Sequence, residues 1–161
     1  MATLPQIFEE DVQEINRALH DLILKTEANA ALLIDKGGFL ITARGETENF
    51  DTTTMGALAA ASFAATESIA TLVSEPNFRS VYQQGETFSL LVDNVDEYSL
   101  LTVVFKAGVS VGAVKYYAAE TVVRIAKQLK AAHDRNPGGG YDLSMLNLPD
   151  TKSLFTKKLK S

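Results

Sequence analysis

The sequence has 161 residues, 46% of them hydrophobic, which is enough for one packed domain and too little for two comfortable ones. It contains no cysteine, so disulfides, thiol catalysis and thiolate metal sites are excluded and a reducing, cytoplasmic setting is expected. The net charge is −5; residues 150–161 hold four lysines and Asp150, a charge of +3, which leaves −8 on residues 1–149. Such an acidic body argues against a nucleic-acid-binding surface.

The N-terminal part predicts a helix followed by a hairpin. The opening MATLPQIFEEDVQE lacks the basic and apolar regions of a signal peptide. Residues 7–24 carry an apolar stripe at spacings of three and four, typical of an amphipathic helix; its members are Phe8, Val12, Ile15, Leu19, Leu22 and Ile23. AALLID (30–35) and GFLITAR (38–44) predict two strands, joined by a turn at Lys36-Gly37-Gly38.

The stretch FDTTTMGALAAASFAATESIATLVSEP (50–76) predicts a second helix of unusual composition. From Thr52 to Ser74 it contains one charged residue, Glu67, so it lacks the solvated polar face of an ordinary surface helix. Its threonines and serines make it too polar for a transmembrane helix, and we expect no stable membrane insertion. Asp51 is placed to cap this helix by accepting a backbone N–H from a threonine that follows it.

The following segment predicts three strands and a third helix. FRSVYQQGETFSLLVDNVDEYSLLTVVF (78–105) breaks at Gly85 and at 94–97, which indicates one short strand and two longer ones. YSLLTVVF has large side chains on both faces, so it is expected in the centre of the sheet. A helical stripe follows and should end by Asn136-Pro137; it consists of Val114, Ala118, Thr121, Val122, Ile125 and Leu129.

The order of elements, α-β-β-α-β-β-β-α, predicts the fold class. It is an α/β sandwich of the α+β type, in which an antiparallel sheet carries helices on both faces. NPGGGYD reads as a linker, so we expect one domain over 1–135 and a Gly-rich linker with a tail helix over 136–161. In the tail, Leu154, Phe155 and Leu159 share one helical face among lysines, which fits a short docking helix or a frayed, solvated end.

No residue pattern indicates catalysis or a bound cofactor. The two histidines, His20 and His133, lie near the ends of different helices, which gives no metal-ligand cluster. No serine follows a strand in a nucleophile turn, and no glycine loop ends in Lys-Ser or Lys-Thr before a helix. Acid pairs such as Glu9-Glu10 are most simply solvated faces. The sequence therefore predicts a protein that is not an enzyme and needs no cofactor or metal.

The second helix offers the clearest candidate for a binding surface. With residues placed about 100° apart, its small side chains lie within about 60° of one line; they are Ala57, Ala60, Ala61, Ala64, Ser68 and Thr71. The other group is expected to pack on the sheet and contains Met55, Leu58, Ser62, Ala65, Ile69, Leu72 and Val73. If this strip of small residues were in contact with solvent, it would expose a large apolar surface, so we expect a partner to cover it. The alternative is an alanine-rich helix buried in a monomer or selected for helix propensity.

The ordered set of segments resembles the roadblock (dynein light chain) family, above all its bacterial gliding-motility members. The segments that carry the resemblance are ALLIDKGGFLITARGETENFDTTTMGALAAASFAATESIATL (31–72), SLLVDNVDEYSLLTVVF (89–105) and the approach from Gly108 to Gly112. The resemblance implies a five-stranded antiparallel sheet with one helix on one face and two on the other. It also implies a homodimer that joins the second helices and the edge strands into one extended sheet.

The resemblance to the bacterial motility members implies a non-enzymatic partner of a small Ras-like GTPase, of which two copies bind one GTPase and speed its GTP hydrolysis. By position, the resemblance places Ala57, Ala61, Ala64 and Ser68 at the dimer and GTPase surface. It makes residues 79–84 the dimerising edge strand, with Arg79, Val81 and Gln83 on it. Leu154 and Phe155 correspond to a C-terminal segment that docks on the GTPase, although KKLKS ends this chain with basic charge where the family implies an acidic finish.

Other interpretations remain at this point. The same dimer could be a scaffold that binds a GTPase or another roadblock protein without changing hydrolysis. A small-ligand sensor would need a polar pocket, whereas these strands point mostly Leu, Val, Ile and Phe inward.

A GTPase is activated when its own switch loops are held in the transition-state arrangement, which needs no residue from the partner. An arginine supplied in trans, Arg44 or Arg79, is the alternative mechanism. The tail lysines make only a small lipid anchor.

Overall fold

The computed structural model describes residues 4–137, which form one sheet and its covering helices. In chain order the elements are α1 (Glu9–Thr26), β1 (Ala30–Asp35), β2 (Leu40–Gly45), the 3-10 helix η1 (Thr47–Asn49), α2 (Thr52–Leu72), β3 (Ser80–Gln83), β4 (Phe88–Asn94), β5 (Ser99–Lys106) and α3 (Val111–Arg135). The predicted order is confirmed, apart from the unpredicted η1 and small shifts at the element ends. The predicted tail, with Leu154 and Phe155, lies outside the described residues, and the domain boundary at 135 stays a prediction.

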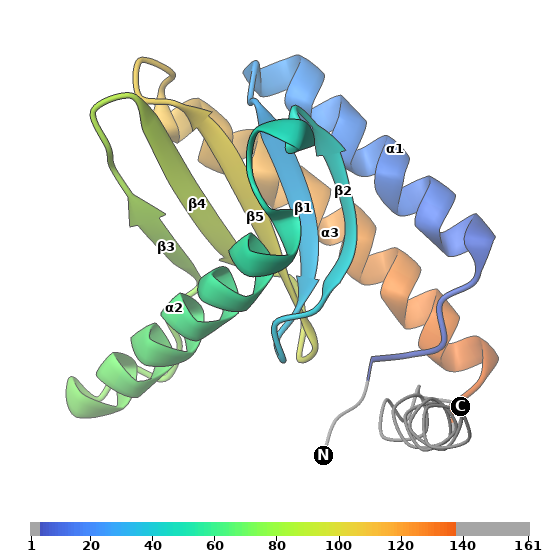
Figure 1. Cartoon of the computed structure of the whole chain (residues 1–161). Coiled ribbons are helices and arrows are strands. Elements are labelled where there is room, and N and C mark those ends of the chain that lie inside the picture. Colours follow the sequence, from blue (N-terminus) through green and yellow to red (C-terminus); the bar gives the residue numbers. More distant parts are fainter. Residues whose placement is uncertain (1–3, 138–161) are drawn as a thin grey trace, which may run out of the picture.

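The strands form one antiparallel sheet in the order β2-β1-β5-β4-β3 (Figure 1). β5 lies in the centre, as its two apolar faces predicted, and β2 and β3 form the edges. α1 and α3 lie side by side on one face of the sheet, while α2 crosses the other face (Figure 1). The predicted α/β sandwich with two helices on one face and one on the other is therefore confirmed.

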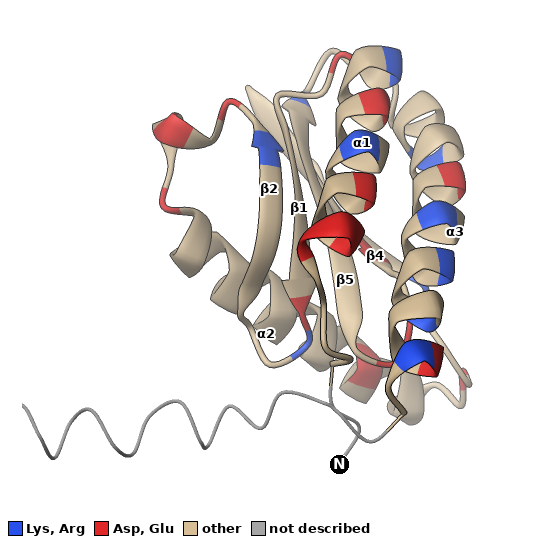
Figure 2. Cartoon of the chain, turned by 90° about the vertical axis from the view of Figure 1, so that its right-hand side faces the viewer, with Lys and Arg blue, Asp and Glu red and all other residues tan. Residues whose placement is uncertain are grey.

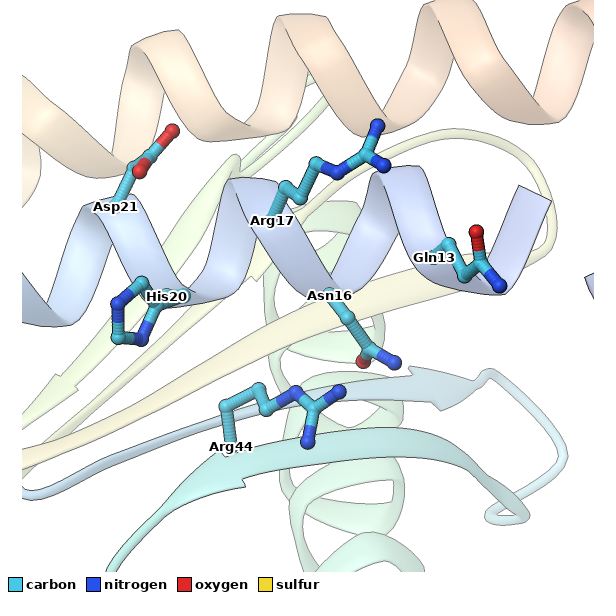
Figure 3. A pocket seen from close by; sticks show the side chains of 6 residues that line it. All are labelled: Gln13, Asn16, Arg17, His20, Asp21 and Arg44. Atoms are coloured by element: carbon cyan, nitrogen blue, oxygen red, sulfur yellow. The ribbon is translucent and has the colours of Figure 1, made fainter. Parts of the chain in front are cut away.

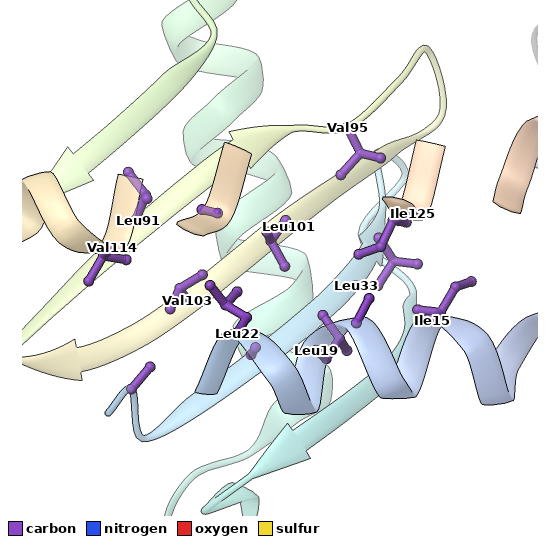
Figure 4. Packing of buried hydrophobic residues seen from close by; sticks show 14 of the residues in the cluster. Ile15, Leu19, Leu22, Leu33, Leu91, Val95, Leu101, Val103, Val114 and Ile125 are labelled. Atoms are coloured by element: carbon purple, nitrogen blue, oxygen red, sulfur yellow. The ribbon is translucent and has the colours of Figure 1, made fainter. Parts of the chain in front are cut away.

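The face under α1 and α3 holds the larger part of the core (Figure 4). Because strand side chains alternate between faces, Leu33 and Leu101 point toward these helices from neighbouring strands. Leu19 of α1 and Ile125 of α3 are fully buried against them. Most residues of the predicted stripes thus form this layer, whereas Phe8 precedes α1 and is 44% exposed.

A buried carboxylate joins the start of α1 to the end of α3. Asp11 is fully buried, and its carboxylate accepts hydrogen bonds from the Phe8 backbone N–H at 2.8 Å, from Gln128 Nε2 at 2.7 Å and from Arg135 Nη2 at 2.6 Å. The Arg135 guanidinium also lies 4.3 Å from the centre of the Phe8 ring. Burial raises the pKa of Asp11, but these hydrogen bonds, led by that of Arg135, outweigh it and leave the pKa below its usual value.

The N-terminus of α2 is fixed by a cap and by a close contact with the β1–β2 turn. Asp51 Oδ1 accepts the backbone N–H groups of Thr53 at 2.9 Å and Thr54 at 3.1 Å, which confirms the predicted cap. Gly38, in the turn, has φ of +98°, and a Cβ there would come within 3.2 Å of the Ala57 Cα. The turn therefore needs glycine both for its backbone angle and to let the helix approach.

Candidate partner-binding surface

The side of α2 that faces the sheet is built from small residues around one aromatic ring. Phe63 is 2% exposed and packs in the second core cluster with Leu32, Leu100 and Val92. The other buried positions of α2 are Gly56, Ala59, Ala60 and Ala70. Small side chains on both sides of Phe63 let the helix lie close to the strands, so one aromatic ring sets which side of α2 is buried.

This orientation corrects the sequence-based assignment of the two sides. Most of the bulkier group, expected on the sheet, faces outward: Leu58 is 64% exposed, Ile69 52%, Leu72 83% and Val73 63%. Ala60, predicted on the partner-binding strip, is instead buried at 6% exposure. The remaining strip residues are exposed, namely Ala57, Ala61, Ala64, Ser68 and Thr71. The prediction failed because neither group contained Phe63, the residue that decides the orientation.

We define the outward face of α2 as its exposed, uncharged side, consisting of Ala57, Leu58, Ala61, Ala64, Ala65, Ser68, Ile69, Thr71 and Leu72. The hydroxyl of Ser68 donates to the Ala64 carbonyl and that of Thr71 to the Glu67 carbonyl, both at 3.3 Å. The polar groups of this face therefore have partners within the helix itself. An apolar partner covers such a face without leaving an unpaired hydroxyl.

The C-terminal half of α2 extends beyond the sheet, past the edge strand β3 (Figure 1). Leu72 is the last residue of α2. The face of the sheet that α2 crosses also carries an apolar area that is not fully covered. Val81 and Leu90 are only partly buried, and Phe88, on the same side of β4 as Leu90, is 50% exposed. The C-terminal part of α2 and the β3–β4 part of the same sheet face thus both leave apolar side chains exposed.

The edge strand begins one residue later than predicted. β3 starts at Ser80, so Arg79 precedes it, although the Arg79 carbonyl still accepts the Asn94 N–H at 2.9 Å. Val81 lies on the strand and Gln83 ends it; Gln83 Nε2 donates to Ser62 Oγ of α2 at 3.3 Å. Since the sheet order ends at β3, its outer side has no strand partner among the described residues.

Charge is nearly absent from α2 and abundant on α1 and α3 (Figure 2). The lone charge of α2, Glu67, lies 3.9 Å from Lys36 Nζ, which in turn lies 5.6 Å from the centre of the Phe63 ring. These residues line a hollow of about 310 Å³ together with Arg79 and Asp96. Charged groups therefore border the outward face of α2 at this hollow rather than interrupting it.

Two further observations limit the chemistry of the described chain. Within residues 4–137, no group of three or more His, Cys, Asp and Glu side chains is arranged to hold a metal ion. α2 is long and apolar enough to cross a membrane, a test that packed helices of soluble proteins also pass. Here α2 packs on a sheet through Phe63 and lies beside charged neighbours.

The chain is similar to known proteins in both sequence and structure. The Roadblock/LC7 domain model matches residues 14–105, which is 92 of 161 residues. Among solved structures, MglB of Myxococcus xanthus superposes with a TM-score of 0.74 and 29% identity, covering 79% of this chain and 96% of that one. The gliding protein MglB of Thermus thermophilus gives 0.73 and 26%, covering 81% and 99%. An MglB with a tetrameric arrangement gives 0.74 and 27%, covering 82% and 99%.

The comparison with curated proteins finds no match. The family model nevertheless spans more than half of the chain, and the solved MglB structures share both its fold and nearly their whole length with it. The chain therefore belongs to the roadblock/LC7 family and is an MglB-like member of it.

Proposed function

We propose that this protein is a homodimeric regulator that activates a small Ras-like GTPase. The observation that carries the proposal is the uncharged outward face of α2, with Leu72 83% exposed at the end of the helix. Its similarity to MglB proteins, one of them named a gliding protein, supports a role in bacterial motility or polarity. The setting of this role is the cytoplasm.

The shape of the α2 side supports self-association. In a two-fold dimer, the C-terminal part of α2 of one copy lies over the partly exposed β3–β4 surface of the other, and the two β3 strands extend one sheet through both copies. Full burial of a Leu or Ile side chain contributes about 1.5–3 kcal/mol, and symmetry counts each contact twice. Leu72 and Ile69 are thus the main anchors, with Arg79, Val81 and Gln83 along the joined edge. The tetrameric MglB supports self-association in this group of proteins.

The GTPase binds across the two α2 helices in this proposal. The small residues Ala57, Ala61, Ala64 and Ser68 let a partner backbone approach closely, which suits recognition of one arrangement of the switch loops. A higher affinity for that arrangement speeds hydrolysis without a residue from this chain. Arg44 is a poor candidate for an arginine supplied in trans, because it lies with α1 on the opposite face of the sheet.

The test is GTP hydrolysis by the cognate GTPase, followed as phosphate release while the protein is titrated in. The proposal predicts a rate that rises and saturates, and a rise lost in the Ala64→Arg/Ser68→Arg variant. The matched control, Ala119→Arg/Ala131→Arg, places the same two charges on exposed positions of α3 and should keep the rise. An unchanged rate with measurable binding would replace the activator by the scaffold, the second candidate from the sequence.

The C-terminal segment is a separate part of the proposal. Leu154 and Phe155 are the apolar residues of this segment that would contact the GTPase. The Leu154→Ala/Phe155→Ala variant should therefore weaken GTPase binding and leave the dimer intact, which binding titrations and light scattering measure side by side. If binding is unchanged, the tail has no part in recognition.

A further inference from the structure

A polar cleft between α1 and β2 lies on the face of the sheet opposite to α2 (Figure 3). It has a volume of about 450 Å³, and its lining residues are Gln13, Asn16, Arg17, His20, Asp21 and Arg44. Five of them lie on α1, and separations of three and four residues among them place them on one side of the helix. Arg44 reaches the same cleft from the edge strand. None of these residues belongs to the surface proposed for the dimer or the GTPase.

Two donor side chains of the cleft, those of Arg44 and Asn16, lie close to each other (Figure 3). In Figure 3 the Arg44 guanidinium points toward the Asn16 side chain, whereas Arg17 and Asp21 point toward α3. The hydroxyl of Thr42 donates to Asn16 Oδ1 at 2.6 Å. This bond occupies the amide oxygen and so presents the Asn16 NH2 group to the cleft. A guanidinium and an oriented amide side by side offer hydrogen-bond donors to an anion.

The charge of the cleft decides which anion fits. Arg17 is paired with Glu14 at 3.0 Å, and Asp21 with Arg124 at 2.7 Å. The hydrogen bond from Arg124 holds the pKa of Asp21 below its usual value, so Asp21 stays charged and occupied. Of the three charged residues that line the cleft, Arg44 therefore provides the positive charge that a ligand meets, His20 aside. A planar carboxylate matches one guanidinium in charge and in geometry, whereas a phosphate dianion would be left half compensated.

We propose that the α1/β2 cleft binds a carboxylate side chain from an acidic segment of a partner protein, held by Arg44 and Asn16. Residues 1–149 carry a net charge of −8, so most of the surface repels an acidic segment. A positively charged cleft in this surface therefore favours binding of such a segment at this one place. Because α2 covers the other face of the sheet, the cleft stays open when a GTPase and a second copy occupy α2. The protein can then hold an acidic partner and the GTPase at the same time.

The probe is a fluorescein-labelled hexaglutamate peptide, titrated with the full chain in low salt and followed by fluorescence polarisation. Losing one charge-assisted contact is expected to weaken binding about tenfold in Arg44→Gln. Thr42→Val changes no charge but frees the amide of Asn16, and a loss of about threefold is expected. Lys130→Gln, the control on α3, removes the same unit charge as Arg44→Gln and should change affinity less than about twofold.

Two readouts separate this site from general attraction between charges. In spectra of 15N-labelled protein, the peptide should shift the Arg44 Nε–H and the Asn16 side-chain signals. Acetate should displace the peptide at a lower concentration than inorganic phosphate does. Equal losses in Arg44→Gln and Lys130→Gln, an unaffected Thr42→Val, or better displacement by phosphate would each overturn the proposal. All of these outcomes are independent of GTP hydrolysis and of the mass of the dimer.

Discussion

The two faces of the sheet are covered in different ways. On the α1/α3 face, large side chains fill the interior and ion pairs such as Arg124–Asp21 join the helices outside (Figures 2 and 4). On the other face, α2 packs through small residues around Phe63 and leaves its larger apolar side chains in solvent. The first face is complete within one chain. The second has an exposed face with the composition typical of an interface, and its exposed apolar residues contribute little to the folding of one chain.

Replacing one leucine on each face by alanine should distinguish a residue needed for folding from a residue needed for association. Leu19 is fully buried and Leu72 is 83% exposed. Leu19→Ala is expected to lower the free energy of unfolding by about 2–5 kcal/mol, because it leaves a cavity. Leu72→Ala should change it by less than about 0.5 kcal/mol in the monomer but weaken the dimer. Urea unfolding measures the free energy of unfolding, at a protein concentration where light scattering shows that the protein is monomeric.

Similar losses of stability in both variants would contradict this division of roles. If Leu19→Ala does not fold, Ile15→Val provides a milder test on the same helix, with an expected loss of about 0.5–1.5 kcal/mol. Ile15 is also fully buried.

The second prediction concerns Asp11, the buried charge that ties the helices of the complete face together. Asp11→Asn leaves Arg135 without its carboxylate and should lower the free energy of unfolding by roughly 2–3 kcal/mol at pH 7. Because the pKa of Asp11 is lowered in the folded state, its contribution is present above the unfolded value near 3.8 and is lost as pH falls through the folded value. Urea unfolding of both proteins between pH 2 and 7 should therefore converge at the acid end. A gap that stays constant with pH would contradict this role.

The third prediction identifies a weak point of the same face. Burial raises the pKa of Asp93 to about 6, and the positive charge of Lys115 offsets this only in part. The folded state thus favours the protonated carboxyl, so stability present below pH 3.8 is lost as pH rises through 6. Asp93→Asn should therefore stabilise the protein above pH 7, by about 1–2 kcal/mol after allowance for solvent screening, and have no such effect near pH 4. Denaturant unfolding at both pH values measures the difference; a variant less stable at pH 8 would refute it.

Most of the fold was predictable because its signals are local. The stripe through Ile15 and Leu19 identified α1, and Asp51 before three threonines identified the start of α2. Large residues on both faces of β5 placed it in the centre of the sheet. Each of these patterns spans fewer than about ten residues and has one dominant physical cause.

The orientation of α2 was not predictable in the same way. Alanine, serine and threonine occur on all sides of this helix, so the positions of its few large side chains do not tell which side packs in the core and which side could form an interface. The residues that could have indicated the buried side were Phe63 with Gly56 and Ala59, an aromatic ring among the smallest residues. The cleft of Arg44 and Asn16 also gave no signal, since it forms only when β2 comes to lie beside α1. The burial of Asp11 likewise depends on Arg135, 124 residues away.

The central claim is that the outward face of α2 is a contact surface, and the molecular mass in solution tests it most directly. Light scattering at micromolar concentration should give at least twice the 17.4 kDa of one chain for the natural protein. It should give the single-chain mass for Ile69→Arg/Leu72→Arg, which places two charges on the proposed dimer anchors, and the natural mass for Ala119→Arg/Ala131→Arg. A natural protein with the mass of one chain, or an α2 variant with an unchanged mass, would contradict the account.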